Sequence, residues 1–291
     1  MQATIKKVGT AYFAKLNGSA EYYIGQETTY QATKGLGFAG SKYYGPVFDP
    51  APHFNRFGAW VYLLGGICQG ESRGYMNLVN SYDRAAFTYG FFQLGAHTPN
   101  DNFVLYIRRM ISDPTFKSLF PDLLLVNGRV HSMSPAGQVD LEKPSTDGKT
   151  IPLFMAYFNP NSLAVDPQEL QTTAKMVYLA NTSSAARFGQ IATGVDITQS
   201  KFKQRFQPWY NLDGRSDTIC LIVADIHHQG RASKEMVKAA LDSSSPIDEL
   251  LKIGAETFPK RIQTLRDTIA AYGAKGWLGS RRYDAASNSF I

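Results

Sequence analysis

The stretch that most constrains this fold is an apolar run over residues 57–68, followed by a single acid, Glu71. Apolar side chains stand at positions 57, 60, 61, 64, 67 and 68, the spacing of one helix face. Arg73-Gly74 then provides a stop, because glycine readily adopts the left-handed conformation that ends a helix. The pattern predicts a buried helix that carries Glu71 near its end. Gly65-Gly66 inside it indicates close packing or a kink.

A polar loop with a second acid follows this helix, and the chain then turns aromatic. The loop carries Asp83, and Thr88 opens the run Tyr89-Gly90-Phe91-Phe92-Gln93. A short aromatic segment that contains glycine is typical of a strand or hairpin. We therefore predict a small β element over residues 87–94.

The rest of the chain is predicted to be mainly helical, which gives a mainly α (α+β) fold. Residues 1–50, rich in Gly and Tyr, are expected to form an irregular or β-bearing N-terminal extension or arm, ended by the turn at Asp49-Pro50. Residues 126–150 are polar and suggest a surface flap, and the tail from Gly273 is expected to be loose. Helices are predicted over 102–111, 116–125, 167–180, 185–193, 216–227 (with a strand as the alternative), 233–241 and 247–272, the last interrupted at Pro259.

Charge and cysteine content limit the classes of partner. The net charge is +6, which favours an anionic partner, but the basic residues are scattered and form no long tract. Nucleic-acid binding is therefore not expected. No apolar run is long enough for a transmembrane helix, and no signal peptide is visible. Cys68 and Cys220 lie in apolar runs and are interpreted as buried free thiols, with a disulfide as the alternative.

Glu71, Asp83 and Thr88 are the residues with the clearest chemical meaning. An acid at the edge of apolar surface loses hydration in its charged form, which favours the protonated state that a general acid needs. A loop aspartate stays hydrated and ionised, so the two acids can divide into proton donor and base. The plainer alternatives are a helix-end acid paired with Arg73 or Arg84 for Glu71, a turn or capping residue for Asp83, and an ordinary strand residue for Thr88.

No metal or cofactor is expected. His227-His228 is the only tempting pair, but adjacent residues on a helix point apart and cannot easily share one metal ion. A position near the end of a helix also suits histidine, because the helix dipole favours a cation there. We interpret both histidines as packing or helix-end residues.

A glutamate on a helix, a loop aspartate and a threonine that enters Tyr-Gly-Phe-Phe-Gln resemble the lysozyme-like superfamily. This group includes phage-type and goose-type lysozymes, lytic transglycosylases and chitosanases. Gly90-Phe91-Phe92-Gln93 is similar to the Gly-x-x-Gln step of lytic transglycosylases, and Glu71-Ser72 to the pair that opens their motif. The segment 224–231, which ends in Gln-Gly-Arg, looks like a later core helix of some members. The spacing from Glu71 to Asp83 is longer than in phage-type enzymes, which leaves inverting hydrolysis, retaining hydrolysis and transglycosylation open.

The resemblance implies that 51–291 is a lysozyme-like catalytic domain that cleaves β-1,4 links in an amino-sugar polymer. It implies peptidoglycan first and chitosan or chitin second. In this interpretation Glu71 protonates the glycosidic oxygen, Asp83 stabilises positive charge or activates water, and Thr88 positions that water. The residues expected to line the sugar subsites are Asn80, Tyr82, Tyr89, Phe92 and Gln93.

Two rival interpretations use the same residues differently. The first is a non-catalytic wall-binding protein that keeps the aromatic surface and attaches through its N-terminal arm. The second is a basic protein associated with nucleic acid, which the scattered charge disfavours. The oligomeric state and the cellular location are left open by the sequence.

Overall fold

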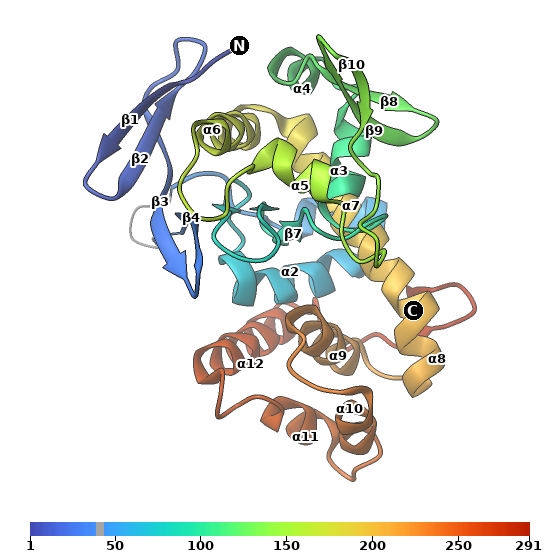
Figure 1. The fold of residues 1–291 in the computed structure, drawn as a ribbon. Helices are drawn as coiled ribbons and strands as arrows, with labels where there is room; N and C mark the ends of the chain where they lie inside the picture. Colours follow the sequence, from blue (N-terminus) through green and yellow to red (C-terminus); the bar gives the residue numbers. More distant parts are fainter. Residues whose placement is uncertain (39–43) are drawn as a thin grey trace. The chain divides into compact units, whose positions relative to one another are not determined.

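In the computed structural model, which describes residues 1–38 and 44–291, the chain forms a mixed α+β structure in which helices predominate (Figure 1). This confirms the α+β class. The chain divides into two compact units, each made of two separate segments. The units are Met1–Val47 with Tyr75–Thr193, and Phe48–Gly74 with Gly194–Ile291. The apolar helix before Glu71 therefore belongs with the C-terminal helices, and the aromatic hairpin belongs with the N-terminal sheet.

The first unit begins with an antiparallel sheet bound to a helix. The sheet has the order β1-β2-β3-β4, formed by β1 (Thr4–Val8), β2 (Ala11–Lys15), β3 (Tyr22–Tyr30) and β4 (Thr33–Gly37). Figure 1 shows it beside α6 (Pro167–Thr182). The Gln171 amide on α6 exchanges two hydrogen bonds with the backbone of Ala3, at 2.8 and 2.9 Å. Strand formation was predicted here from short alternating pieces, and the structure adds their pairing into one sheet.

One buried carboxyl joins three segments of the first unit. Glu169 closes a capping box at the start of α6, because its Oε2 accepts from the Asp166 backbone amide at 3.1 Å. Its Oε1 accepts from the Leu36 amide of β4 at 2.9 Å and contacts the Ser81 hydroxyl beside β5 (Val79–Asn80). Burial raises the pKa of Glu169. The sheet, the hairpin and α6 are thus held by a single side chain.

The hairpin predicted over residues 87–94 is confirmed as two short strands and a tight turn. β6 (Thr88–Tyr89) pairs with β5 on one side and with β7 (Leu94–Gly95) on the other. Gly90 opens the turn with φ +76°, and a β-carbon there would lie 2.0 Å from Gln190 Oε1. Only glycine fits this position. Phe87, just before β6, packs against Phe103 at 5.4 Å between ring centroids, which anchors the hairpin in the core.

Residues 126–150 differ from the predicted loop. They continue a three-stranded antiparallel sheet of β8 (Leu123–Val126), β9 (Arg129–Ser134) and β10 (Gly137–Asp140). Asn127 and Gly128 both have positive φ, 51° and 76°, and form the two-residue turn that Asn-Gly favours in hairpins. The helix predicted over 116–125 is correspondingly shorter, because α4 (Pro114–Leu119) ends before β8 begins. The other helices of this unit are α3 (Phe103–Met110), α5 (Pro152–Phe158) and the first part of α7 (Ser184–Lys201).

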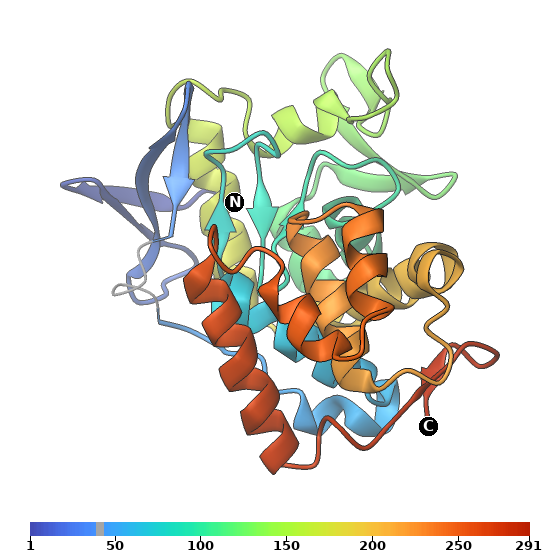
Figure 2. The ribbon, with the colours of Figure 1, turned by 90° about the horizontal axis from the view of Figure 1, so that it is seen from below.

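In the second unit, the buried helix predicted before Glu71 is α2 (Trp60–Ser72). Two other helices pack closely against its glycines. These are α9 (Asp217–Gln229) and α12 (Pro259–Ala274), seen beside α2 in Figures 1 and 2. A β-carbon on Gly65 would lie 2.6 Å from the Tyr272 hydroxyl of α12, and one on Gly66 would lie 2.7 Å from the Leu221 side chain of α9. The glycine pair thus serves close packing, one of its two predicted roles.

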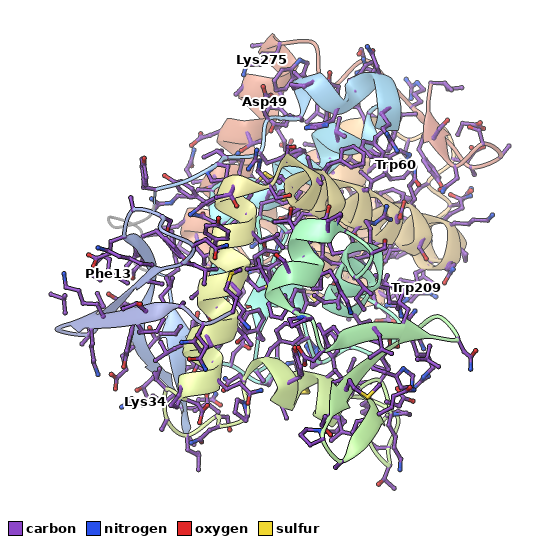
Figure 3. The ribbon with its side chains drawn as sticks, turned by 90° about the horizontal axis from the view of Figure 1, so that it is seen from above. Phe13, Lys34, Asp49, Trp60, Trp209 and Lys275 are labelled. Carbon is purple, nitrogen blue, oxygen red and sulfur yellow. The ribbon has the colours of Figure 1, made fainter. Side chains whose placement is uncertain are left out.

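The C-terminal tail packs on the start of α2 rather than lying loose. β11 (Tyr283–Asp284) and β12 (Ser289–Phe290) form a small hairpin. The buried indole of Trp60, labelled in Figure 3, packs edge to face on the rings of Tyr283 and Phe290, with ring centroids 6.2 and 4.8 Å apart. An exposed tail would leave these aromatic rings in water, and the burial of Tyr283 and the partial burial of Phe290 explain the ordered hairpin. The predicted break before α12 is confirmed, since the preceding helix α11 (Pro246–Lys252) ends ahead of Pro259.

The two cysteines are buried free thiols, as the sequence favoured. Cys68 lies on α2 and Cys220 on α9, and both are fully buried. The remaining elements of this unit are η1 (Ala51–His53), α1 (Phe54–Phe57), the last part of α7, η2 (Phe202–Phe206, π-helical), α8 (Gln207–Tyr210) and α10 (Lys234–Leu241). Throughout residues 1–38 and 44–291, no helix combines the length and apolar character needed to cross a membrane.

Candidate functional site

Glu71 lies in the last turn of α2, just before Arg73 ends the helix in the left-handed conformation. Its side chain keeps 20% of its surface exposed. The partner of Glu71 is neither Arg73 nor Arg84 but Arg261 on α12, whose Nη1 lies 2.6 Å from Glu71 Oε1. His228 Nε2 lies 3.6 Å from the same oxygen. Two basic groups therefore hold one oxygen of a carboxyl that still reaches the surface.

A buried chain of charges extends from Glu71 into the second unit. Arg261 Nη2 donates to Asp225 Oδ1, and Arg231 Nη1 donates to Asp225 Oδ2, both at 2.6 Å. The Arg231 and Asp225 side chains are 0% and 1% exposed. Two carboxylates thus face two guanidinium groups, and each buried charge is compensated by an opposite one.

A glycine makes room for this network beside α2. A β-carbon on Gly70 would lie 3.1 Å from Cζ of Arg261, so the guanidinium rests directly on the helix backbone one residue before Glu71. No local pattern in the sequence points to Arg261. Its partners Glu71 and Asp225 come from two other helices, and local periodicity does not report on such long-range pairing.

The adjacent histidines separate, as predicted for neighbours on a helix. His228 turns toward Glu71, while His227 stacks between the rings of Phe206 and Tyr210, at 5.0 and 5.6 Å. His227 Nε2 is 2.6 Å from the Tyr210 hydroxyl, and burial, aided by the Arg205 charge, lowers the pKa of His227. Within the described parts of the chain, no three His, Cys, Asp or Glu side chains gather as metal ligands would.

In the first unit, the hairpin brings together three of the predicted site residues. The Asn80 side chain donates to Gln93 Oε1 at 2.6 Å, and the Thr88 hydroxyl donates to the Asn80 carbonyl at 3.0 Å. Gln93, held at φ 50°, donates in turn to the Gly90 carbonyl at 2.7 Å. The result is a half-buried polar group of side chains built on β5, β6 and the turn.

Asp83 lies where two pockets of the first unit meet. Its Oδ1 accepts from the Ala85 amide at 2.9 Å, so the turn role considered from the sequence is present. The two pockets measure about 580 and 300 Å³ and share Thr33, Asp83 and Arg84 in their walls. We call these two pockets together the Asp83 groove. The first also contains Tyr30 and Tyr82, whose ring centroids are 6.4 Å apart.

Tyr89 and Phe92 differ from the sequence-based expectation that they line sugar subsites. They are 0% and 2% exposed. The Tyr89 hydroxyl donates to the Met176 carbonyl at 3.1 Å, and its ring packs on Tyr106. Their large apolar surfaces are worth more inside the core than in a wet groove, and neither ring is available to a ligand in this structure.

His97 is a residue beside the hairpin that the sequence did not select. Its Nδ1 is buried and has no hydrogen-bond partner among the described residues, and it would lie 3.0 Å from a β-carbon on Gly95. Burial, followed by the nearby Arg84 charge, lowers the pKa of His97. A histidine in a loop carries no periodic signal, so only the fold reveals that it neighbours the Asp83 groove.

The predicted catalytic residues are divided between the two units. Glu71 belongs to the second unit, and Asp83, Thr88 and the predicted sugar-binding residues belong to the first. The structure brings Asn80, Thr88 and Gln93 together, and it places Tyr82 with Asp83 in one pocket. Comparison of the chain with protein-family models, with curated proteins and with solved structures finds no match.

Proposed function

We propose that this protein is a glycoside hydrolase of lysozyme-like character that cleaves β-1,4 links in an amino-sugar polymer. Peptidoglycan is the first substrate class and chitosan or chitin the second. The proposal joins the resemblance in residues 60–94 to the chemistry of the two groups of side chains described above.

The observation that carries the proposal is the position of Asp83 in the wall of two adjoining pockets. Two adjoining pockets that share wall residues offer room for more than one sugar unit of a polymer. Tyr30 and Tyr82 add ring faces and hydroxyl groups, the combination that stacks on a sugar and bonds its oxygens. An acid beside such rings can stabilise positive charge on a sugar or activate a water.

Glu71 is proposed as the proton donor. Because Arg261 pairs with Oε1, the proposal requires Glu71 to carry its proton on Oε2 when the substrate binds. The ion pair and the end of α2 fix the direction of the carboxyl, and its 20% exposure leaves a path for a substrate oxygen. Positioning of this kind lowers the entropic part of a reaction barrier.

Thr88 is proposed to hold the attacking water. Its hydroxyl hydrogen is directed to the Asn80 carbonyl, so its lone pairs can accept a hydrogen bond from water. Asn80 and Gln93 brace it through the hydrogen bond between their amides. The roles of Asp83 and Thr88 differ between inverting and retaining hydrolysis, and the products decide between them.

Product analysis on purified cell walls tests the proposal. Soluble fragments with new reducing ends indicate hydrolysis, and fragments that end in anhydro-sugars indicate a lytic transglycosylase. The same assay on chitosan and chitin ranks the substrates. If walls bind the protein but release no fragments of either kind, the non-catalytic wall-binding alternative replaces the proposal.

A further inference from the structure

A third pocket in the first unit lies on the N-terminal sheet and, among the residues that the structure describes, shares no wall residue with the Asp83 groove. It measures about 510 Å³, and we call it the sheet pocket. Its described walls come from β2, from β3 with the preceding Glu21, from residues 44–46 and from the last turn of α6. Aromatic side chains dominate them, namely Phe13, Tyr22, Tyr23 and Tyr44. Figure 3 labels Phe13 on this sheet.

The rings of the sheet pocket are held in place by contacts of their own. Phe13 meets Tyr23 edge to face, with centroids 5.6 Å apart. The Tyr22 hydroxyl donates to the Ala174 carbonyl of α6 at 3.0 Å, which fixes the ring against the helix. Tyr44 is the exception, because 90% of its surface is exposed. An aromatic ring left in water beside a formed pocket is a surface on which a ligand can stack.

The wall around Tyr44 is fixed before any ligand binds. The Asn77 side chain donates both to the Tyr44 carbonyl, at 3.1 Å, and to Asn181 Oδ1, at 2.9 Å. A β-carbon on Gly45 would lie 2.2 Å from Asn77 Nδ2, so only glycine allows this approach. Asn77 thus ties the Tyr44 segment to α6 and sets the orientation of the Asn181 amide. A site built in advance loses less entropy when it binds.

The charge of the sheet pocket selects the class of ligand. Among the wall residues that the structure describes, Glu21 carries the only charge, and Asn181 adds an amide. Glu21 is itself paired with Lys6, whose Nζ lies 3.4 Å from Glu21 Oε1, so the pocket presents little net charge and suits a neutral group better than phosphate or nucleic acid. Three tyrosines with an amide and an acid match the faces and hydroxyl groups of a pyranose ring.

We propose that the sheet pocket binds a pyranose unit of an amino-sugar chain without cleaving it. The described wall residues include one carboxyl, that of Glu21, whereas glycoside hydrolysis normally uses two. The pocket then acts as an anchor that keeps the enzyme on an insoluble polymer. The inference takes its sugar class from the proposed function, but it does not depend on cleavage.

Binding is tested with the full chain carrying Glu71→Gln, so that the probe survives the measurement. The probes are the tetramer of N-acetylglucosamine and the tetramer of glucosamine. Binding of each probe is measured by the shifts of the backbone amide resonances of the protein. We expect Tyr22, Tyr23 and Asn181 to shift with at least one probe. A stronger response to the cationic glucosamine tetramer would show that Glu21 contacts the ligand directly. A stronger response to the acetylated tetramer would show that the pocket prefers a neutral sugar.

Tyr44→Ala is the test variant, and Tyr30→Ala, a 54% exposed tyrosine of the Asp83 groove, is the matched control. Tyr44→Ala should weaken binding at the sheet pocket by roughly 2- to 10-fold, the range expected for one lost aromatic contact. In the chain that keeps Glu71, Tyr44→Ala should also reduce retention on insoluble walls while leaving the cleavage of a soluble tetramer unchanged. Tyr30→Ala should leave the sheet-pocket shifts as they are.

The inference is overturned if no amide of the sheet pocket responds to either tetramer, or if Tyr44→Ala binds as tightly as its parent. Cleavage of cell walls without binding at the sheet pocket would refute the anchor role and leave the proposed hydrolase activity in place. Binding at this pocket without any cleavage would keep the anchor and remove the proposed hydrolase activity.

Discussion

Removing one charge from the network behind Glu71 should destabilise the protein strongly. Asp225→Asn keeps the size of the side chain but removes the carboxylate that pairs with Arg231, whose side chain is 0% exposed, whereas Arg261 keeps its ion pair with Glu71. Loss of one partner from a buried ion pair costs about 3–5 kcal/mol, because the remaining charge is left uncompensated. For a chain of this size that is a fall of roughly 6–20 °C in the unfolding midpoint. Thermal unfolding followed by circular dichroism measures it.

A surface pair of the same kind supplies the control. Asp242 pairs with Lys238 at 2.8 Å, but both side chains are more than half exposed, at 56% and 57%. Asp242→Asn should therefore change the free energy of unfolding by less than about 0.5 kcal/mol. If the two aspartate variants unfold at the same temperature, the network does not carry the energy assigned to it, and its role in holding Arg261 against Glu71 is refuted.

Three further predictions concern Glu169, Gly90 and the two cysteines. Burial raises the pKa of Glu169, so its contribution to stability is complete below the ordinary value of 4.5 and is lost as the pH rises through the raised pKa. Urea unfolding between about pH 4 and pH 8 should show this slope, and Glu169→Gln should remove it; an unchanged slope would assign it to other groups. Gly90→Ala should cost about 1–3 kcal/mol more than Gly128→Ala, because both glycines have φ +76° but only Gly90 faces Gln190 at 2.0 Å; equal urea midpoints would show that the clash relaxes freely. Burial raises the pKa of both cysteine thiols, so a thiol reagent at neutral pH should modify them only as fast as the protein unfolds, and rapid labelling of the native protein would contradict their burial.

Local patterns in the sequence were enough to predict the main helices and the aromatic hairpin. The apolar spacing before Glu71 predicted α2, and the apolar run around Cys220 predicted α9. Both predictions were possible because each pattern repeats within a few residues. The sheet β8-β9-β10 was missed although Asn127-Gly128 is a strong hairpin signal, because the short apolar run of β8 was assigned to the helix predicted over 116–125 and β9 is mostly polar.

The candidate site was only partly predictable, because its chemistry depends on contacts between distant segments. Glu71, Asp83 and Thr88 stand out in the sequence through their local setting. Arg261, which holds Glu71, lies on the last helix, and no local signal connects them. Tyr89 was expected to line a sugar subsite because its motif resembles that of lysozyme-like enzymes, but its place in the core follows from packing against Tyr106, which only the fold defines.

The central claim is that Glu71 donates the proton that breaks a glycosidic bond, and the release of reducing ends from purified cell walls by Glu71→Gln tests it most directly. Glu249→Gln is the matched control, since Glu249 is a helical glutamate paired with Lys252 at 2.6 Å on the exposed surface of the same unit. With circular dichroism showing both variants folded, we predict that Glu71→Gln slows release by roughly 100- to 10,000-fold, the usual contribution of a general acid, and that Glu249→Gln digests walls at the wild-type rate. Release by folded Glu71→Gln at the wild-type rate would contradict the assignment of Glu71 as the proton donor.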